Sequence, residues 1–173
     1  MRHYTLNKDR DDRPLLVTVF CDASLKDGIV GWGYWIKSSE VRVEGSGACR
    51  LPGTKQCSSV AEFLGLVDAV KAAHTAHPDR PIDIVLQCDN INALQWCANF
   101  GKFAKKSELK RKPCSIPNVV SVNAAELSVA LTGNLWLKHV RGHSSGCTRT
   151  GVNNHTDTLA RKAREEFEQR IKG

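Results

Sequence analysis

The pattern of apolar residues along the chain predicts five β-strands. Leu15–Phe20 and Ile82–Leu86 are β-rich apolar runs, which are typical of buried strands. A second strand is expected to begin at Trp32 and reach Ile36, after a turn punctuated by glycines. Around Val41 to Val43, apolar residues alternate with charged ones, as in a half-exposed strand. A fifth strand is expected from Leu135 to Val140.

Helical spacing of apolar residues follows the third strand. From Ser59 the apolar positions recur every three to four residues until His77-Pro78, which predicts an amphipathic helix. Further helices are expected from Asn90, as a cap, to about Phe100, from Asn123 to Leu131 and from Asn154 to Ile171. Three strands, a helix, a strand, helices, a strand and a helix together predict an α/β fold. Its sheet should be mixed, with parallel central strands covered by helices.

Length and charge narrow the class of protein. The chain has 173 residues, of which 41% are hydrophobic, so it can form one globular domain with a proper core. Residues 1–14 are expected to be a polar tail. The net charge of +7 and the sequence pI of about 9.2 favour a polyanionic partner such as nucleic acid, although solvated surface lysines would give the same charge.

The seven cysteines are odd in number and form no CxxC pair, so neither a zinc ribbon nor a disulfide framework is expected. The chain shows no apolar signal segment after Met1 and no run long enough to span a membrane. A reducing, cytoplasmic setting is therefore expected.

Cys21 and Cys88 each precede an aspartate at the end of an apolar run. We expect both to be small buried residues on the opposite face of their strands.

Four acidic residues are the main candidates for chemistry. Asp22 and Asp89 follow the two apolar runs, where carboxylates are rare, and Glu62 and Asp157 lie near the starts of predicted helices. Each has a purely structural explanation. Ser59 and Glu62 fit a capping box, and Asp157 suits the first turn of a helix. Asp89 could cap the following helix, and Asp22 could belong to an Asx-turn.

The four acids together are harder to explain by capping. One sheet with a helix on its face can gather all four, and carboxylates so close repel one another unless a divalent cation is bound. Mg²⁺ prefers such oxygen ligands. His143 follows a strand in the loop Val140–Gly146 and could move protons beside the metal site, although an exposed loop histidine is the simpler reading of that residue alone.

The chain resembles type 1 ribonuclease H from about Leu15 to the last helix. The acids occur in the order of that family, Asp, Glu, Asp and Asp. The most specific segments are Val140-Arg141-Gly142-His143 and 153–160, Asn-Asn-His-Thr-Asp-Thr-Leu-Ala. The Asp22-Ala23-Ser24 form of the first motif is also found in ribonuclease H domains of mobile elements.

The resemblance implies a ribonuclease-H-like catalytic domain over residues 15–173, with a five-stranded mixed sheet of three antiparallel strands plus parallel central strands, flanked by helices. It implies hydrolysis of the RNA strand of RNA–DNA hybrids with two Mg²⁺ ions, which Mn²⁺ could replace, giving 5′-phosphate and 3′-hydroxyl ends. Asp22, Glu62, Asp89 and Asp157 would bind the metal, and His143 would assist turnover.

Contacts to the hybrid are expected from a basic protrusion at about 100–113, unless its lysines are only a solvated surface. The family commonly has Thr-Asn-Asn before the catalytic Glu, whereas this chain has Cys57-Ser58-Ser59. A nucleic-acid-binding module without cleavage and a DNA-cutting relative of the same fold are the alternatives. A monomer is expected. The full set of expected substrate contacts is Ser24, Cys57, Ser58, Ser59, Asn90, Lys102, Lys105, Lys106 and Arg141.

Overall fold

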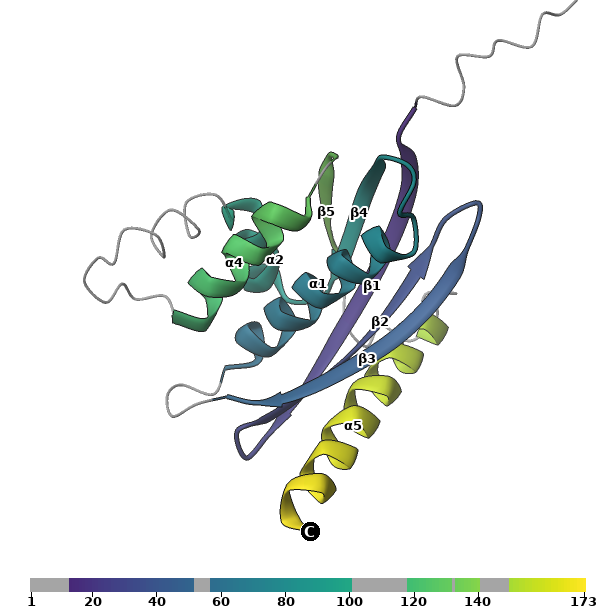
Figure 1. Cartoon of the computed structure of the whole chain (residues 1–173). Helices are drawn as coiled ribbons and strands as arrows, with labels where there is room; N and C mark the ends of the chain where they lie inside the picture. The colour runs from purple at the N-terminus through teal and green to yellow at the C-terminus, as the bar shows by residue number, and fades with distance from the viewer. Residues whose placement is uncertain (1–12, 52–56, 101–117, 132, 141–149) are drawn as a thin grey trace, which may run out of the picture.

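The structure, a computed structural model, describes residues 13–51, 57–100, 118–131, 133–140 and 150–173. Within these residues five strands form one sheet, and helices lie on both of its faces (Figure 1). The strands are β1 (Leu15–Lys26), β2 (Ile29–Lys37), β3 (Arg42–Arg50), β4 (Ile82–Cys88) and β5 (Leu135–His139). The helices are α1 (Ser58–Thr75), α2 (Ile91–Ala98), α4 (Asn118–Ala130) and α5 (Thr150–Lys172).

The strand order in the sheet is β3-β2-β1-β4-β5. β1, β2 and β3 form an antiparallel meander, whereas β4 pairs parallel to β1 and β5 pairs parallel to β4. This arrangement confirms the mixed sheet expected from the order of elements. The parallel strands need long crossovers, and these are supplied by α1 before β4 and by α2 and α4 before β5.

The first hairpin differs from the expected one. β1 continues past Phe20 to Lys26, and Lys26 pairs directly with Ile29 of β2. The turn between them needs left-handed backbone only at Asp27 (φ 50°) and Gly28 (φ 76°). The glycines that follow were expected to lie in the turn, and that expectation was wrong, because they lie within β2.

The main core lies between the sheet and α1. Alternate residues of β1, including Val17 and Val19, point into this layer and are fully buried, as Phe63 and Leu66 of α1 are. The short helix α2 and the helix α4 pack beside α1 (Figure 1). α1 is therefore buried on nearly every side along its first half, which fixes the position of any side chain it carries there.

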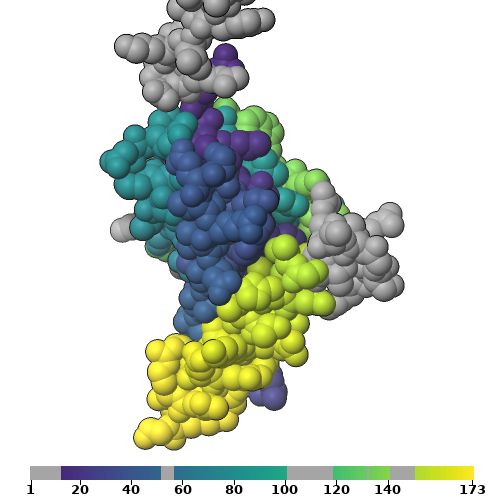
Figure 2. Space-filling view, turned by 90° about the vertical axis from the view of Figure 1, so that its right-hand side faces the viewer, coloured from purple at the N-terminus to yellow at the C-terminus, as the bar shows by residue number. Residues whose placement is uncertain are grey.

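α5 covers the opposite face of the sheet, across β2, β1 and β3. In Figure 2 the yellow surface of α5 borders the blue surface of residues 30–50. Two glycines of β2 allow this close approach. A β-carbon on Gly33 would lie 2.5 Å from the carbonyl oxygen of Thr156 and 2.6 Å from the β-carbon of Leu159. Gly31 meets the backbone of Ala160 in the same way.

Three helix starts lie earlier than the sequence pattern indicated. α1 begins at Ser58 with Cys57 as its N-cap, α4 begins at Asn118, and α5 begins at Thr150 instead of Asn154. Ser58 and the residues 150–153 are mostly polar or small, so apolar periodicity does not detect them, whereas the stretch 118–122 carries three valines and its helical continuation was missed. Among the described residues, no helix combines the length and apolar character needed to cross a membrane.

The tight seat of α5 on β2 gives a stability test. Gly33→Ala should destabilise the fold by about 1–3 kcal/mol, because the added methyl group forces the backbone of α5 away from the sheet. Urea unfolding would measure the loss. Gly151→Ala, in α5 with nothing within 4 Å of its β-carbon position, is the matched control and should stabilise the helix slightly. Equal stability of the wild type and Gly33→Ala would contradict the close packing.

Candidate active site

Two acidic residues reach one edge of the sheet through the parallel pairing of β1 with β4. The paired residues run from Leu15 with Ile82 to Phe20 with Gln87. Asp22 and Asp89 each lie two residues beyond this last pair, so the two acids leave adjacent strands at the same level. Asp22 was expected at the end of its strand, and that was wrong. It lies inside β1, opposite Gly33 of β2, at the point where β4 has ended.

Glu62 enters the same place from α1. Its side chain is 5% exposed. One carboxylate oxygen, Oε1, accepts a hydrogen bond from the Ala23 backbone N–H at 3.2 Å, and Oδ1 of Asp22 accepts from the same N–H at 2.8 Å. A single backbone donor therefore holds the carboxylates of Asp22 and Glu62 together.

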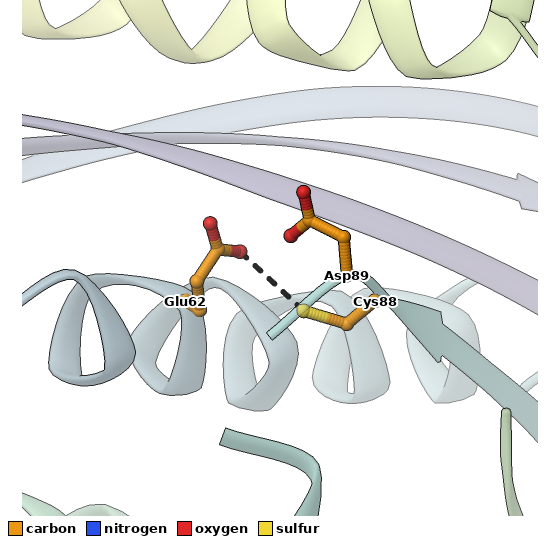
Figure 3. Close-up of side chains that lie close together, drawn as sticks. All are labelled: Glu62, Cys88 and Asp89. Atoms are coloured by element: carbon orange, nitrogen blue, oxygen red, sulfur yellow. Dashed lines mark hydrogen bonds between the residues drawn. The ribbon is translucent and has the colours of Figure 1, made fainter. Parts of the chain in front are cut away.

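The sulfur of Cys88 contacts the other oxygen of Glu62. The thiol donates to Oε2 at 3.6 Å, as the dashed line in Figure 3 marks. The possible ligand atoms of Glu62, Cys88 and Asp89 all lie within 4.8 Å of one another. Across the described segments, this is the group of three or more such side chains that is compact enough to hold a metal ion.

The capping explanations of these acids are wrong. The N-cap of α1 is Cys57 and makes no side-chain bond, while the hydroxyl of Ser59 donates to Oδ1 of Asn90 at 3.1 Å. Ser59 and Glu62 therefore form no capping box. The side chain of Asn90 caps α2, as expected, which leaves Asp89 without a capping role. Among the described residues, the Asp22 carboxylate accepts a backbone hydrogen bond from its next neighbour, Ala23, and this contact is not an Asx-turn.

Asp157 lies beside this group and not within it. Because α5 begins at Thr150, Asp157 is about two turns into the helix, so the expected place in the first turn was wrong. Its Oδ2 lies 3.0 Å from a guanidinium nitrogen of Arg161, and its side chain is 36% exposed. Its charge still acts on Asp22, whose pKa it raises. The structure thus places three acids close together and the fourth near enough for its charge to act on Asp22.

Two contributors to the site, Cys88 and His139, were not predicted as such. Cys21 and Cys88 are 1% and 0% exposed, which confirms the expected burial, but Cys88 also contacts Glu62. His139 Nε2 lies 2.9 Å from the carbonyl oxygen of Asp89 and holds the main chain there. Side chains alternate along a strand, and this alternation places Cys88 on the face of the sheet that α1 covers. Its contact with Glu62 could have been inferred from the sequence if α1 had been assigned to that face.

Several expected substrate residues are described. Ser24 is half-buried, directly beyond Asp22 and Ala23, and Cys57 is half-buried at the N-terminus of α1. Ser58 is exposed, whereas Ser59 is buried and its hydroxyl is engaged with Asn90. The remaining expected site residues, His143, Arg141, Lys102, Lys105 and Lys106, lie outside the described residues.

Comparison with known proteins identifies the architecture. No family model matches the chain, and no curated protein does. Solved structures do match. RNase H1 from the halophilic archaeon Halobacterium salinarum is 20% identical with a TM-score of 0.55, over 87% of this chain and 98% of that one. The chain has the type 1 ribonuclease H fold.

Two further structures with this fold are similar. LC9-RNase H1, described as a type 1 RNase H with the type 2 active-site motif, is 20% identical with a TM-score of 0.68, over 89% of this chain and 74% of that one. LC11-RNase H1, isolated from compost by a metagenomic approach, was solved in complex with an RNA/DNA hybrid. In that complex it is 13% identical with a TM-score of 0.59, over 87% of this chain and 98% of that one.

Burial and mutual repulsion raise the pKa values of two acids in this ribonuclease H fold, Asp22 and Glu62. Burial, followed by the charge of Asp89, raises the pKa of Asp22 from 3.8 to about 6. Burial, followed by the charges of Asp22 and Asp89, raises the pKa of Glu62 well above its ordinary value. No described cation is paired with either group. A bound divalent cation would relieve this repulsion, so the donor set fits a hard metal ion.

The raised pKa of Asp22 predicts a pH-dependent cost to stability. Between pH 3.8 and about 6 the folded protein holds a proton on Asp22 that the unfolded chain releases. The stability gained from that proton is full below pH 3.8 and is lost as the pH rises through about 6. Asp22→Asn removes the charge, so at pH 8 the metal-free variant should be more stable than the wild type by on the order of 2–3 kcal/mol.

The stability difference should shrink below pH 4 and should also shrink when Mg²⁺ is added at pH 8. Urea unfolding across this pH range would measure it. Asp79→Asn, which neutralises an exposed carboxylate outside the site, is the control for the loss of one negative charge. A difference between Asp22→Asn and wild type that is constant with pH would show that the charge of Asp22 is not destabilising.

Proposed function

We propose that this protein is a metal-dependent endonuclease that hydrolyses the RNA strand of RNA–DNA hybrids. The observation that carries the proposal is the convergence of Asp22, Glu62 and Asp89, from β1, α1 and the end of β4, on one edge of a ribonuclease H fold. Helix capping does not explain these acids, because the caps of α1 and α2 are formed by other residues.

The metal would be held by Asp22, Glu62, Asp89 and Asp157. Two bound Mg²⁺ ions, or Mn²⁺ in their place, would supply an activated water and stabilise the leaving 3′ oxygen, which gives 5′-phosphate and 3′-hydroxyl products. The repulsion among the acids and the absence of a described cation beside Glu62 support this assignment. Asp157, half-exposed at the edge, would be the ligand nearest to solvent.

The protein would contribute rigid placement of the carboxylates. The Ala23 N–H fixes Asp22 and Glu62, and His139 fixes the main chain of Asp89, so the acids are held in place before any substrate arrives. His143, in the segment that follows β5, would accept or deliver a proton as the product leaves.

The partner would be a hybrid duplex because its wide minor groove offers 2′-hydroxyls beside the scissile RNA strand. Ser24, the exposed Ser58 and the neighbouring Cys57 lie around the acidic residues in sequence and are the proposed groove contacts, with Ser59, Asn90 and Arg141. The hybrid bound by LC11-RNase H1 supports the same class of partner, as the net charge of +7 does. Residues 15–173 would form the catalytic domain, preceded by the tail 1–14, and the protein would act as a monomer.

Replacing Asp89 tests the catalytic proposal. Asp89→Asn keeps the shape of the side chain but removes a charge at which metal would bind. Cleavage of a labelled RNA–DNA hybrid in Mg²⁺ should fall by at least about a hundredfold, the scale seen when one electrostatic group leaves a preorganised site. Hybrid binding, measured by fluorescence anisotropy, should remain largely intact.

Wild-type protein with EDTA and Asp79→Asn with Mg²⁺ are the controls for this assay, and duplex RNA and duplex DNA are the competing substrates. EDTA should abolish cleavage and Asp79→Asn should leave it unchanged. Hybrid binding without cleavage by the wild type would favour a binding module. Equal cleavage of duplex DNA would favour a DNA-cutting relative of this fold.

The basic stretch is proposed as a handle for the hybrid. Replacing both Lys105 and Lys106 with alanine should weaken hybrid binding and reduce the slope of log affinity against log salt concentration by about 2, because two phosphate contacts are lost. Lys172→Ala removes a lysine at the far end of α5, about 22 Å along the helix from Asp157, and should leave the slope unchanged. An unchanged slope in the double variant would remove this stretch from the binding surface.

A further inference from the structure

We propose that Cys88 gives the acidic site a second mode of metal binding, in which thiophilic divalent ions such as Zn²⁺ or Cd²⁺ are held by Glu62, Cys88 and Asp89. In this mode the sulfur and two carboxylate oxygens bind one ion at the inner side of the cluster, and such an ion would compete with Mg²⁺. The proposal rests on the metal-binding function proposed above, because it shares Glu62 and Asp89 with that site.

The three side chains are already close to the geometry of such an ion. A Zn–S bond of about 2.3 Å and a Zn–O bond of about 2.1 Å at a tetrahedral angle place sulfur and oxygen about 3.6 Å apart. Cys88 Sγ and Glu62 Oε2 are 3.6 Å apart in the structure. A carboxylate oxygen of Asp89 lies within 4.8 Å of both, so movement of that side chain toward them would complete a three-ligand set (Figure 3).

The two oxygens of Glu62 have different surroundings. Oε1 accepts from the Ala23 backbone N–H, on the side of Asp22. Oε2 faces Cys88, and that thiol is its hydrogen-bond partner among the described residues. Because Glu62 is 95% buried, as its 5% exposure shows, Oε2 has little access to water. It is thus a buried carboxylate oxygen aimed at a sulfur, with no partner outside the cluster among the described residues, where a cation would compensate its charge.

The donor set selects the class of ion. A thiolate is a soft ligand that Zn²⁺ and Cd²⁺ bind well, whereas Mg²⁺ prefers oxygen and retains its waters. Metal binding would replace the S–H bond of Cys88 with a metal–sulfur bond and release the proton to solvent. A site made of carboxylates alone would offer these ions only oxygen ligands. The sulfur of Cys88 therefore makes this site more favourable for soft ions than a purely oxygen-ligated site.

Cadmium provides a direct test, because a Cd²⁺–thiolate bond absorbs in the ultraviolet. Metal-free full-length protein would be titrated with CdCl₂ in excess Mg²⁺ and without nucleic acid. The wild type should show a charge-transfer band that saturates at one equivalent. In Cys88→Ser this band should be lost and the Cd²⁺ affinity at the site should fall at least about tenfold, since even outer-shell changes cost 10–100-fold.

Two further variants keep the result interpretable. Cys97→Ser alters a cysteine that is fully buried in the core away from the acids, and it should retain the band. Asp89→Asn leaves every cysteine in place and should weaken the band, which tests the site even if Cys88→Ser does not fold. No saturating band in the wild type, or an equal band in Cys88→Ser, would overturn the proposal.

The outcome is independent of catalysis. If the hybrid assay with Mg²⁺ fails while the cadmium band behaves as expected, the soft metal site exists and the endonuclease proposal falls. If hybrid cleavage is observed while the band is absent or insensitive to Cys88, the proposed function stands and the second binding mode is wrong.

Discussion

The parallel pairing of β1 with β4 is the constraint on which the site depends. It sets the two strands at a fixed register, so the residues after Phe20 and Gln87 leave the pair at the same level. Two sequence-distant segments, each a cysteine followed by an aspartate, thereby become neighbours. α1 connects the meander to β4 and packs against both strands, which places Glu62 opposite this edge. The site is a consequence of the strand register and the crossover helix.

The same constraint opposes stability. Charges at the boundary of a packed core lose hydration, and neighbouring charges of one sign repel, which raises the pKa values of Asp22 and Glu62. An apolar residue in place of Asp22 or Glu62 would avoid this loss of hydration and this repulsion. Retaining acids there is the pattern expected where function opposes stability, as at sites that await a counter-ion.

Part of this arrangement was predictable from the sequence. Continuous apolar runs identify β1 and β4, and helical spacing identifies α1, because these segments bury the same residues that make the patterns visible. The start of α5 was missed, since Thr150 to Asn153 are not apolar in a periodic way. The capping box was wrong for a different reason. Ser59 has the right spacing from Glu62, but its hydroxyl is used by Asn90.

The contacts of Cys88 and His139 were not predictable from local sequence. Each depends on which face of a strand meets which neighbour, and a one-residue change of register would reverse it. Cys88 was correctly expected to be buried, because burial follows from the pattern within its own strand. Its contact with Glu62 joins residues 26 positions apart, and only the packed structure supplies that information.

The shared hydrogen bond from Ala23 has a consequence for sequence variation at that position. Both carboxylates are held by the main-chain N–H and not by the methyl group. A side chain that fits the local space can therefore replace alanine without disturbing the donor. Proline alone among the common residues lacks this hydrogen. The side chain at position 23 can therefore vary during evolution, whereas proline is excluded there because the backbone N–H is required.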